Sequence, residues 1–484
     1  MMRYRLVFSG LLPVFLIALF SCQPATAPEE AGSTIPVPKN VILFIGDGMG
    51  FNQVLAANYY VYGEAGAAIY EQADWLKLAA ATYPAVTRIR DNDTTYSDGY
   101  SPRLAWSSSE YLATGYTGSA ESATAISTGK KTYGTSIGIG LSGDSLVHAS
   151  QAAKALGKSI GVVTSVPFTH ATPAGFAAHN HSRHNFGEIA MYMLFHTRLD
   201  VIMGAGNPDY NNDGEPAESS VRYIGSREIW NQLKANDGRT EFMEGGQTFR
   251  VQDVNGDGQR DAWTFAESRE DFLALAEGPA PARVFGVPKA YSTLHYGRSG
   301  EDKEMPFGQP MNQNVPTLEE LTRASLNVLG QNPGGFFVMI EGGAIDWAGH
   351  DNHLGRTIEE QIDFNNSVRA AVEWVERNSS WDETLIIVTS DHETGYLTGP
   401  DHPDPVAQPV INQGKGQLPG AKWNSTDHTN MLVPFYAKGV GAEIFELFAG
   451  EKDPVRGPFI QNSEVGQALF LMWGKPEITV FRLN

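Results

Sequence analysis

The sequence predicts an α/β fold with a largely parallel central sheet flanked by helices on both faces. Short apolar runs of the kind that buried parallel strands show recur along the chain, and each ends just before side chains that bind metals. The runs cover residues 41–45, 159–164, 336–340 and 385–389. Amphipathic stretches alternate with these runs, which predicts right-handed crossovers between parallel strands. These stretches cover residues 146–156, 317–329 and 358–376.

The composition fits a large globular protein. Of the 484 residues, 42% are hydrophobic and 19% are charged, which are ordinary values for a folded domain. The length suits one large α/β domain with insertions. The formal net charge is −20, and no segment concentrates Lys and Arg as a phosphate backbone would require. We therefore expect no nucleic-acid partner.

The first 22 residues have the character of a targeting segment. Arg3 and Arg5 precede an apolar stretch at 6–20, which is too short to span a membrane comfortably. Cys22, the only cysteine, follows a small residue and resembles the lipidated cysteine of bacterial lipoproteins. We expect export to the periplasm or cell surface with a lipid anchor. The alternative is secretion with cleavage near residues 25–27.

Residues 23–38 are rich in Pro, Ala, Glu and Ser, which predicts a flexible tether. Residues 39–484 are then expected to form a single domain. The strand-helix alternation breaks at about 205–310, where Gly, Pro, Asn and Asp are frequent, and again at 400–424. Both segments are predicted to be surface insertions.

Potential metal ligands follow each of the apolar runs. Carboxyl ends of parallel strands meet at one edge of a sheet, where ligands bind, so these side chains should converge. They are Asp47, His170, Thr172, Glu341, Asp391 and His392.

A further pair, Asp346 and His350, lies four residues apart, so a helix would place both on one face to hold a single ion. An Asp-x-x-x-His spacing alone is more often a solvated helix face. The adjacent Asp391 and His392, together with His428 as a third zinc ligand, favour the metal site.

Ser119 is the candidate nucleophile. It lies in a stretch of small residues at 117–129, and we expect it at a helix N-terminus, where the helix dipole favours an anion. Gly129 predicts the end of that helix. A serine hydroxyl becomes a good nucleophile when a zinc ion lowers its pKa. Taken alone, the segment would also suit a close helix contact.

Six motifs occur in the order seen in alkaline phosphatases, and the chain resembles that family over about residues 39–440. The motifs are residues 46–50, 119–133, 172–174, 341–350, 389–392 and 427–429. The resemblance implies an alkaline-phosphatase-like fold with two zinc ions and one magnesium ion. It assigns the first zinc to Asp346, His350 and His428. It assigns the second zinc to Asp47, Asp391 and His392, with Ser119. It assigns the magnesium to Asp47, Thr172 and Glu341.

The resemblance also implies the reaction. Ser119 would attack the phosphorus of a small phosphate monoester at two zinc ions about 4 Å apart, and water would then hydrolyse the phosphoserine. Arg183 would hold two phosphate oxygens, a bidentate task that suits arginine. Relatives suggest a homodimer. The alternatives are a phosphodiesterase or sulfatase of the same superfamily, or a catalytically silent metal-binding surface lipoprotein.

Three positions depart from the family pattern or vary within it. Gly118 stands where the family has an aspartate before the nucleophile, so the carboxylate that would orient Arg183 is missing. His170 replaces an aspartate of the best-studied bacterial branch and is expected either to lie behind the magnesium ligands or to permit zinc at that site. Trp347 is expected to wall the substrate entrance.

Two loops resemble calcium-binding loops. In the first, oxygen-bearing side chains alternate around glycines, as calcium loops require, but the closing glutamate is absent. Its candidate ligands are Asp253, Asn255, Asp257 and Asp261. A turn stabilised by Asp and Asn side chains is an equal alternative. The second loop, at 209–214, is less complete.

Overall fold

The computed structural model describes residues 35–90, 93–300, 304–400 and 406–475. Residues Pro36–Asn484 cluster as one compact unit. The targeting segment, Cys22 and most of the tether lie outside the described residues, so export and lipidation stay predictions. Across the described residues, no helix combines the length and apolarity that crossing a membrane requires.

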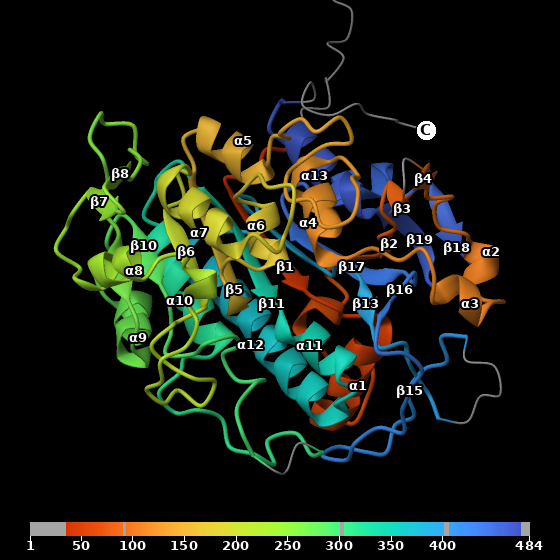
Figure 1. Ribbon diagram of the computed structural model, residues 1–484. Helices are drawn as coiled ribbons and strands as arrows, with labels where there is room; N and C mark the ends of the chain where they lie inside the picture. The colour runs from red at the N-terminus through yellow and green to blue at the C-terminus, as the bar shows by residue number, and fades with distance from the viewer. Residues whose placement is uncertain (1–34, 91–92, 301–303, 401–405, 476–484) are drawn as a thin grey trace, which may run out of the picture. The chain divides into compact units, whose positions relative to one another are not determined.

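An eleven-stranded sheet runs through this unit (Figure 1). In spatial order its strands are β18 (Glu451–Asp453), β19 (Gly457–Gln461), β2 (Leu76–Ala81), β17 (Val433–Gly439), β12 (Thr384–Thr389), β1 (Asn40–Gly46), β11 (Phe336–Gly342), β5 (Ser159–Pro167), β6 (Val201–Ala205), β10 (Val284–Gly286) and β9 (Thr264–Ala266).

The central part of the sheet is parallel, as predicted. All neighbouring strands from β12 to β9 pair in parallel, whereas β17 runs antiparallel to both β12 and β2. Ile45 lies opposite both Glu341 and Thr389, and Glu341 lies opposite Thr164. The carboxyl ends of the four predicted strands therefore lie in register, and the residues that follow them lie at the same edge of the sheet.

The strands have apolar side chains on both faces because helices cover both. In β1, Val41, Leu43 and Ile45 contribute to one core cluster, and Ile42 and Phe44 contribute to the other. This alternation follows from the two-residue period of a strand. All five side chains are fully buried, so β1 lies in the middle of the domain.

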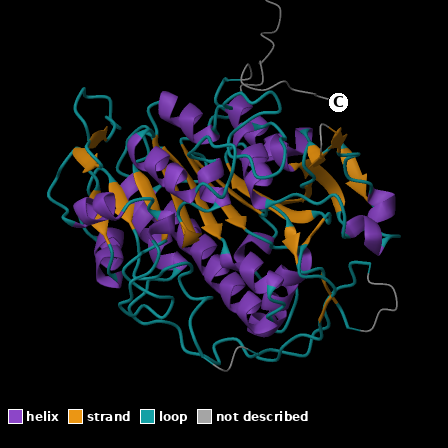
Figure 2. Cartoon of the chain, viewed as in Figure 1, coloured by secondary structure: helices purple, strands orange, loops and turns teal. Residues whose placement is uncertain are grey.

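The helices divide between the two faces (Figures 1 and 2). The first cluster is built by α4 (Ser119–Thr128), α5 (Ala149–Ala155), α6 (Ala171–Gly175), α7 (Phe186–Phe195), α8 (Arg227–Lys234) and α13 (Asn462–Met472). The second is built by α1 (Phe51–Tyr62), α9 (Arg269–Glu277), α10 (Leu318–Leu329), α11 (Ala344–His350) and α12 (Leu354–Asn378).

The predicted helices are found with shifted ends. The helix expected at 317–329 is α10, and Thr317 caps it: its hydroxyl accepts the Glu320 N–H, and Glu320 accepts the Thr317 N–H. The helix expected at 358–376 is the longer α12. The helix expected at 146–156 is the shorter α5, because the Leu146 N–H pairs with the Gly138 carbonyl before the helix begins.

The segment at 205–310 is not only a surface insertion. Its strands β9 and β10 extend the central sheet beyond β6, although α8, α9 and the hairpin of β7 (Glu241–Glu244) and β8 (Gln247–Arg250) come from the same segment. Strands of three residues carry too little pattern to be recognised among so many turn residues. In the described part of 400–424, Gln408 is bonded to Asn52 of α1.

Several short elements surround this framework. Most important is the pairing of β13 (Glu393–Thr394) with β16 (His428–Thr429), which places His428 opposite Thr394, close to the end of β12. The others are β3 (Val86–Arg90), β4 (Asp93–Tyr96), β14 (Leu397–Thr398), β15 (Lys422–Trp423), α2 (Pro102–Ala105), α3 (Ser109–Leu112) and the 3-10 turns η1 (Ile69–Glu71), η2 (Val221–Tyr223) and η3 (Ala442–Leu447).

Candidate active site

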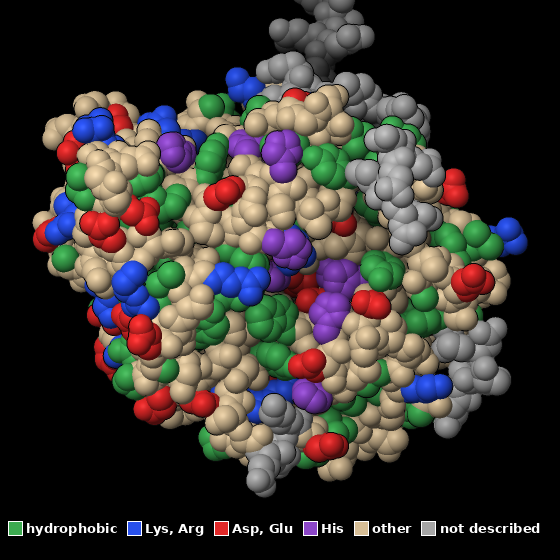
Figure 3. Space-filling model, in the orientation of Figure 1, with side chains coloured by type: hydrophobic (Ala, Val, Ile, Leu, Met, Phe, Trp, Pro, Cys, Tyr) green, Lys and Arg blue, Asp and Glu red, His purple; other side chains and the backbone are tan. Residues whose placement is uncertain are grey.

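The predicted ligands meet beyond the carboxyl edge of the sheet. Asp47 follows β1, Glu341 ends β11, and Asp391 and His392 follow β12. All four are fully buried. Figure 3 shows histidine and acidic side chains gathered around a hollow on this face of the molecule. The convergence that strand ends predicted is present.

Ser119 is the first residue of α4, as predicted. Gly118 precedes the helix in an extended conformation, and Gly129 ends it in the left-handed region, with φ 72°. The Ser119 Oγ lies 3.3 Å from Nε2 of His392 and accepts a hydrogen bond from Arg183 Nη1 at 3.3 Å. A few residues on, the Ser122 hydroxyl donates to the Asp391 carbonyl at 2.8 Å and ties the helix to the ligands.

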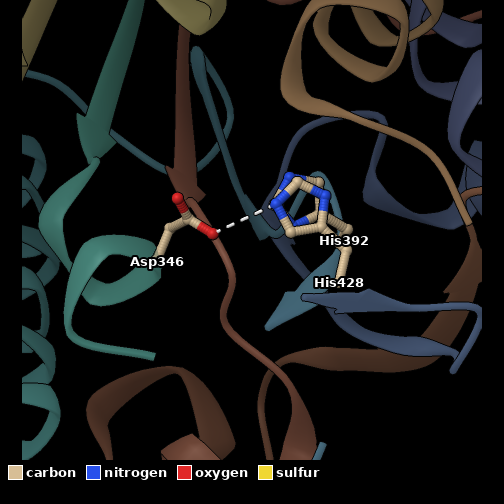
Figure 4. Close-up of side chains that lie close together, drawn as sticks. All are labelled: Asp346, His392 and His428. Carbon is tan, nitrogen blue, oxygen red and sulfur yellow. Dashed lines mark ion pairs between the residues drawn. The ribbon is translucent and has the colours of Figure 1, made fainter. Parts of the chain in front are cut away.

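The first ligand group contains Asp346, His350 and His428. The Asp346 Oδ1 lies 3.3 Å from Nε2 of His350 and 3.4 Å from Nε2 of His428, and the two histidine nitrogens are 3.1 Å apart. Figure 4 shows the Asp346 carboxylate facing the overlapping rings of His392 and His428. The Asp346, His392 and His428 ligand atoms also lie within 4.8 Å of one another. His392 therefore links this group to the next.

The second group is Asp47, Asp391 and His392. The His392 Nε2 lies 3.5 Å from Oδ1 of Asp47 and 3.2 Å from Oδ2 of Asp391. The three side chains come from two adjacent parallel strands, β1 and β12, which explains why they meet although they are far apart in sequence. This is the set that the family resemblance assigns to the second zinc.

The third group differs from the expectation at one residue. Ligand atoms of Asp47, Glu341 and His170 lie within 4.8 Å of one another. Thr172, one of the predicted magnesium ligands, is fully buried in α6. His170 thus lies close to the ligand atoms of Asp47 and Glu341, because it occupies the N-cap position of α6 at the end of the short loop after β5.

The donor atoms in these groups suit hard and borderline cations. Both oxygens of Asp47, Oε1 of Glu341, Oδ2 of Asp391 and Oγ1 of Thr172 are buried and accept no hydrogen bond. Buried polar atoms are nearly always paired, and a cation is one way to satisfy such oxygens. Carboxylate oxygens with imidazole nitrogens match zinc, and oxygen-rich sets match magnesium. The residues therefore fit the metals that the resemblance implies.

Electrostatics support the same conclusion. Burial, together with the carboxylates of neighbouring residues, raises the pKa of Asp47 well above its usual range. Burial and Asp346 raise the pKa of Asp391 to about 6, and burial raises the pKa of Glu341 to about 7. Carboxyl groups held together out of water resist ionisation, and a divalent cation would reverse this effect.

The pKa of Asp346 is shifted in the opposite direction. Burial alone would raise its pKa, but the hydrogen bonds from His350 and His428 outweigh burial and hold the pKa well below its usual range. Asp346 in turn raises the pKa of His350 to about 9, although burial acts against this. Burial lowers the pKa of His392 far below its usual value, so its ring is neutral and can act as a ligand.

A pocket of about 490 Å³ opens over Ser119 and the first ligand group. Arg183 lines it, as do three aromatic side chains, Tyr116, Tyr296 and Trp347. This is the place that the sequence predicted for Trp347. Arg183 also contacts Nε2 of His170 through Nη2 at 3.1 Å. The arginine therefore lies beside Ser119, the candidate nucleophile, at the wall of the pocket.

Sequence reasoning missed several residues that support the site. Thr164 donates to Oε2 of Glu341, and Thr394 donates to Oδ1 of Asp346. Thr164 had a recognisable signal, since it is a polar residue in an otherwise apolar strand end. Tyr116 and Tyr296 had none, because their place in the pocket depends on how distant loops pack.

Both calcium-like loops use their oxygens internally. Asp253 accepts the backbone N–H groups of Gly256 and Gly258. Asp261 accepts the Val254 N–H, and Asn255 donates to Asp257 and Asp261. The ligand groups that converge within the described residues do not include this loop. In the other loop, Asp209 is paired with Arg227 and Lys234. The geometry agrees with turns stabilised by Asp and Asn side chains.

Comparisons with known proteins agree with this site. The family model described as alkaline phosphatase matches residues 38–418. Alkaline phosphatase 3 of Bacillus subtilis is 28% identical over 392 residues, which cover 80% of this chain and 68% of that protein. The alkaline phosphatase of Escherichia coli is 28% identical over 427 residues, which cover 83% and 81%.

Solved structures show the same fold. The alkaline phosphatase from the Antarctic bacterium TAB5 aligns with a TM-score of 0.58 at 24% identity, over 92% of this chain and 100% of that one. The Thermus thermophilus alkaline phosphatase aligns with a TM-score of 0.61 at 20% identity, over 92% and 93%. The family match ends before His428, whose place in the site rests on the geometry. Because the family model matches most of the chain, this protein belongs to the alkaline phosphatase family, and its membership implies hydrolysis of phosphate monoesters.

Proposed function

We propose that the chain hydrolyses small phosphate monoesters through a phosphoserine at Ser119, with two zinc ions and one magnesium ion as cofactors. The observation that carries this proposal is the position of the Ser119 hydroxyl. The Ser119 Oγ lies 3.3 Å from Nε2 of His392, a candidate zinc ligand, and 3.3 Å from Nη1 of Arg183. It also lines the open pocket.

Each of the three ligand groups would hold one metal ion. Asp346, His350 and His428 would hold one zinc, and Asp47, Asp391 and His392 would hold the other. Asp47, Thr172 and Glu341 would hold the magnesium, with His170 within reach. When bound, these ions would supply positive charge opposite the phosphate and lower the pKa values of the serine hydroxyl and of water.

The chain's own residues perform the remaining tasks. The two terminal nitrogens of Arg183 would hold two phosphate oxygens and orient the phosphorus toward Ser119. Ser119 Oγ releases its proton to solvent and forms a bond to phosphorus while the bond to the leaving oxygen breaks, and that oxygen takes up a proton from solvent. Water then attacks the phosphoserine and releases a proton, the bond to Oγ breaks, Oγ takes up a proton again, and inorganic phosphate leaves. The pocket leaves room for leaving groups of varied shape, which supports a broad range of monoesters.

The test compares p-nitrophenyl phosphate, bis(p-nitrophenyl) phosphate and p-nitrophenyl sulfate in the presence of zinc and magnesium. We expect the monoester to be hydrolysed fastest. Ser119→Ala should reduce monoester turnover by roughly a thousandfold or more, whereas Ser107→Ala, at an exposed serine, should not. Faster hydrolysis of the diester would favour the phosphodiesterase alternative, and no hydrolysis of any substrate would favour the silent metal-binding protein. Full monoesterase activity in Ser119→Ala would refute the assignment of the nucleophile.

Arg183 can be tested separately through product inhibition. Arg183→Ala should weaken inhibition by inorganic phosphate, and Arg183→Lys should restore only part of it, because lysine cannot bond two oxygens in a fixed plane. Unchanged inhibition in the alanine variant would show that another group holds the phosphate.

A further inference from the structure

Glu121 connects the start of the nucleophile helix to a neighbouring loop. Its side chain is 9% exposed and turns back toward the helix N-terminus. One carboxylate oxygen, Oε1, accepts the Gly118 N–H at 2.7 Å, and the other, Oε2, accepts the Thr135 N–H at 3.2 Å. The carboxylate therefore joins the residue before Ser119 to a residue outside the helix.

Thr135 has a conformation that needs such support. Its φ is 66°, in the left-handed region that branched residues rarely adopt. Its N–H is held by Glu121, and its carbonyl accepts the Arg183 N–H at 2.8 Å. The backbone of the phosphate-binding arginine is thus fixed through Thr135.

These contacts close a ring at the active site. From Ser119 the connection runs through Gly118, Glu121 and Thr135 to the backbone of Arg183, and the guanidinium of Arg183 returns to the Ser119 Oγ at 3.3 Å. Glu121 touches neither metal ligands nor the pocket lining among the described contacts. Its two hydrogen bonds therefore hold the backbone around Ser119 in a fixed position relative to the loop that carries Arg183.

We propose that Glu121 is a positioning residue that fixes Arg183 relative to Ser119. The proposal rests on the proposed function, since it assigns Arg183 to the phosphate. It also explains why a residue without a side chain precedes the nucleophile. A Cβ atom at Gly118 would lie 3.2 Å and 3.4 Å from the two oxygens of Glu121, so an acidic side chain there would meet a second carboxylate. We therefore expect a carboxylate at position 118 and one at position 121 to compete for the same space.

The experiment uses the full chain loaded with zinc and magnesium. We would compare Glu121→Ala, Glu121→Gln and the control Glu110→Ala, which removes an exposed glutamate. The measurements are the inhibition constant of inorganic phosphate, kcat and KM for p-nitrophenyl phosphate, bound metal and the thermal midpoint. Glu121→Ala should raise the phosphate inhibition constant and KM by roughly tenfold with metal content unchanged, because small displacements of a binding group are costly.

If the Glu121→Ala variant does not fold, the Glu121→Gln variant tests the same proposal. It keeps the size and one acceptor but turns an amide group toward the other N–H, so a rise of about threefold is expected. Gly118→Asp adds a second test, of the competition between positions 118 and 121. It should impair phosphate inhibition in the wild-type background more than in the Glu121→Ala background, where the opposing carboxylate is gone.

Three outcomes would overturn the proposal. One is a Glu121→Ala variant whose phosphate inhibition matches that of Glu110→Ala. Another is a loss of kcat that accompanies loss of metal with no change in phosphate inhibition. The third is a Gly118→Asp effect of equal size in both backgrounds. Failure of the proposed function differs from all three, because the wild-type chain itself would then lack phosphate-inhibited monoesterase activity.

Discussion

Removal of the metals should reveal how much the fold resists the ionisation of Glu341. The perturbation is Glu341→Gln in protein treated with a chelator. Burial raises the pKa of this fully buried carboxyl from 4.5 to about 7. One pKa unit corresponds to about 1.4 kcal/mol, so ionised Glu341 destabilises the metal-free fold by about 3 kcal/mol. Glutamine has nearly the same shape and no charge, so it avoids this cost.

The pH dependence has a definite sign. A carboxyl whose pKa is higher in the folded state binds more protons there than in the unfolded chain between the two pKa values. The stability of the wild-type protein therefore falls, through this group, as the pH rises from about 4.5 to about 7, and the effect is constant above that. The free energy of unfolding of Glu341→Gln, relative to wild type, should increase by about 3 kcal/mol over the same interval.

The assay is urea denaturation of the metal-free proteins, followed by tryptophan fluorescence at several pH values. Comparison with wild type cancels the titration of groups that do not interact with Glu341, and Glu110→Gln, which removes an exposed carboxyl, provides the control. With zinc and magnesium present, Glu341→Gln should instead bind less magnesium. A metal-free stability difference that stays constant between pH 4.5 and 7.5 would refute the reasoning.

Three further perturbations follow from the geometry. Gly48→Ala should reduce bound zinc, measured by metal analysis after dialysis, because φ is +75° and an added Cβ would lie 2.7 Å from the Asp346 Cα; full zinc content would contradict this. Lys154→Met should lower the free energy of unfolding by about 3 kcal/mol in urea denaturation, since the buried Asp200 loses its ion pair at 2.7 Å and keeps the hydrogen bond from the Ile160 N–H. Trp347→Ala should raise KM about three- to tenfold for aryl phosphates and hardly at all for glycerol phosphate, because the ring lines the pocket; equal effects on both would argue against stacking.

The strand ends made much of the site predictable. Asp47, Glu341 and Asp391 follow apolar runs that form adjacent parallel strands, and the level register of those strands brings the three carboxyls together. The helical spacing of Asp346 and His350 likewise needed only local geometry. These features depend on short-range patterns, which a sequence carries directly.

Other features depend on long-range packing and were less accessible. His428 was predicted as a ligand, but the pairing that brings it to the site was not, because β16 and β13 are strands of two residues each, which no periodicity marks. Strands β9 and β10 have only three residues each, so their place in the central sheet was missed. The bridge from Glu121 to Thr135 was also missed, since nothing in the spacing of these residues indicates that the loop folds back on the helix.

The wide spread of the ligands along the chain has a consequence for assembly. Asp47 directly follows β1, the first strand along the chain, whereas His428 belongs to the short strand β16 near the end of the domain. Any chain that stops before β16 lacks one of the three side chains of the first ligand group. Parallel pairing between distant segments is also slow to form, because long loops must close first. The ligand groups therefore assemble only when segments far apart in the chain have paired, and a truncated chain would not hold the full set.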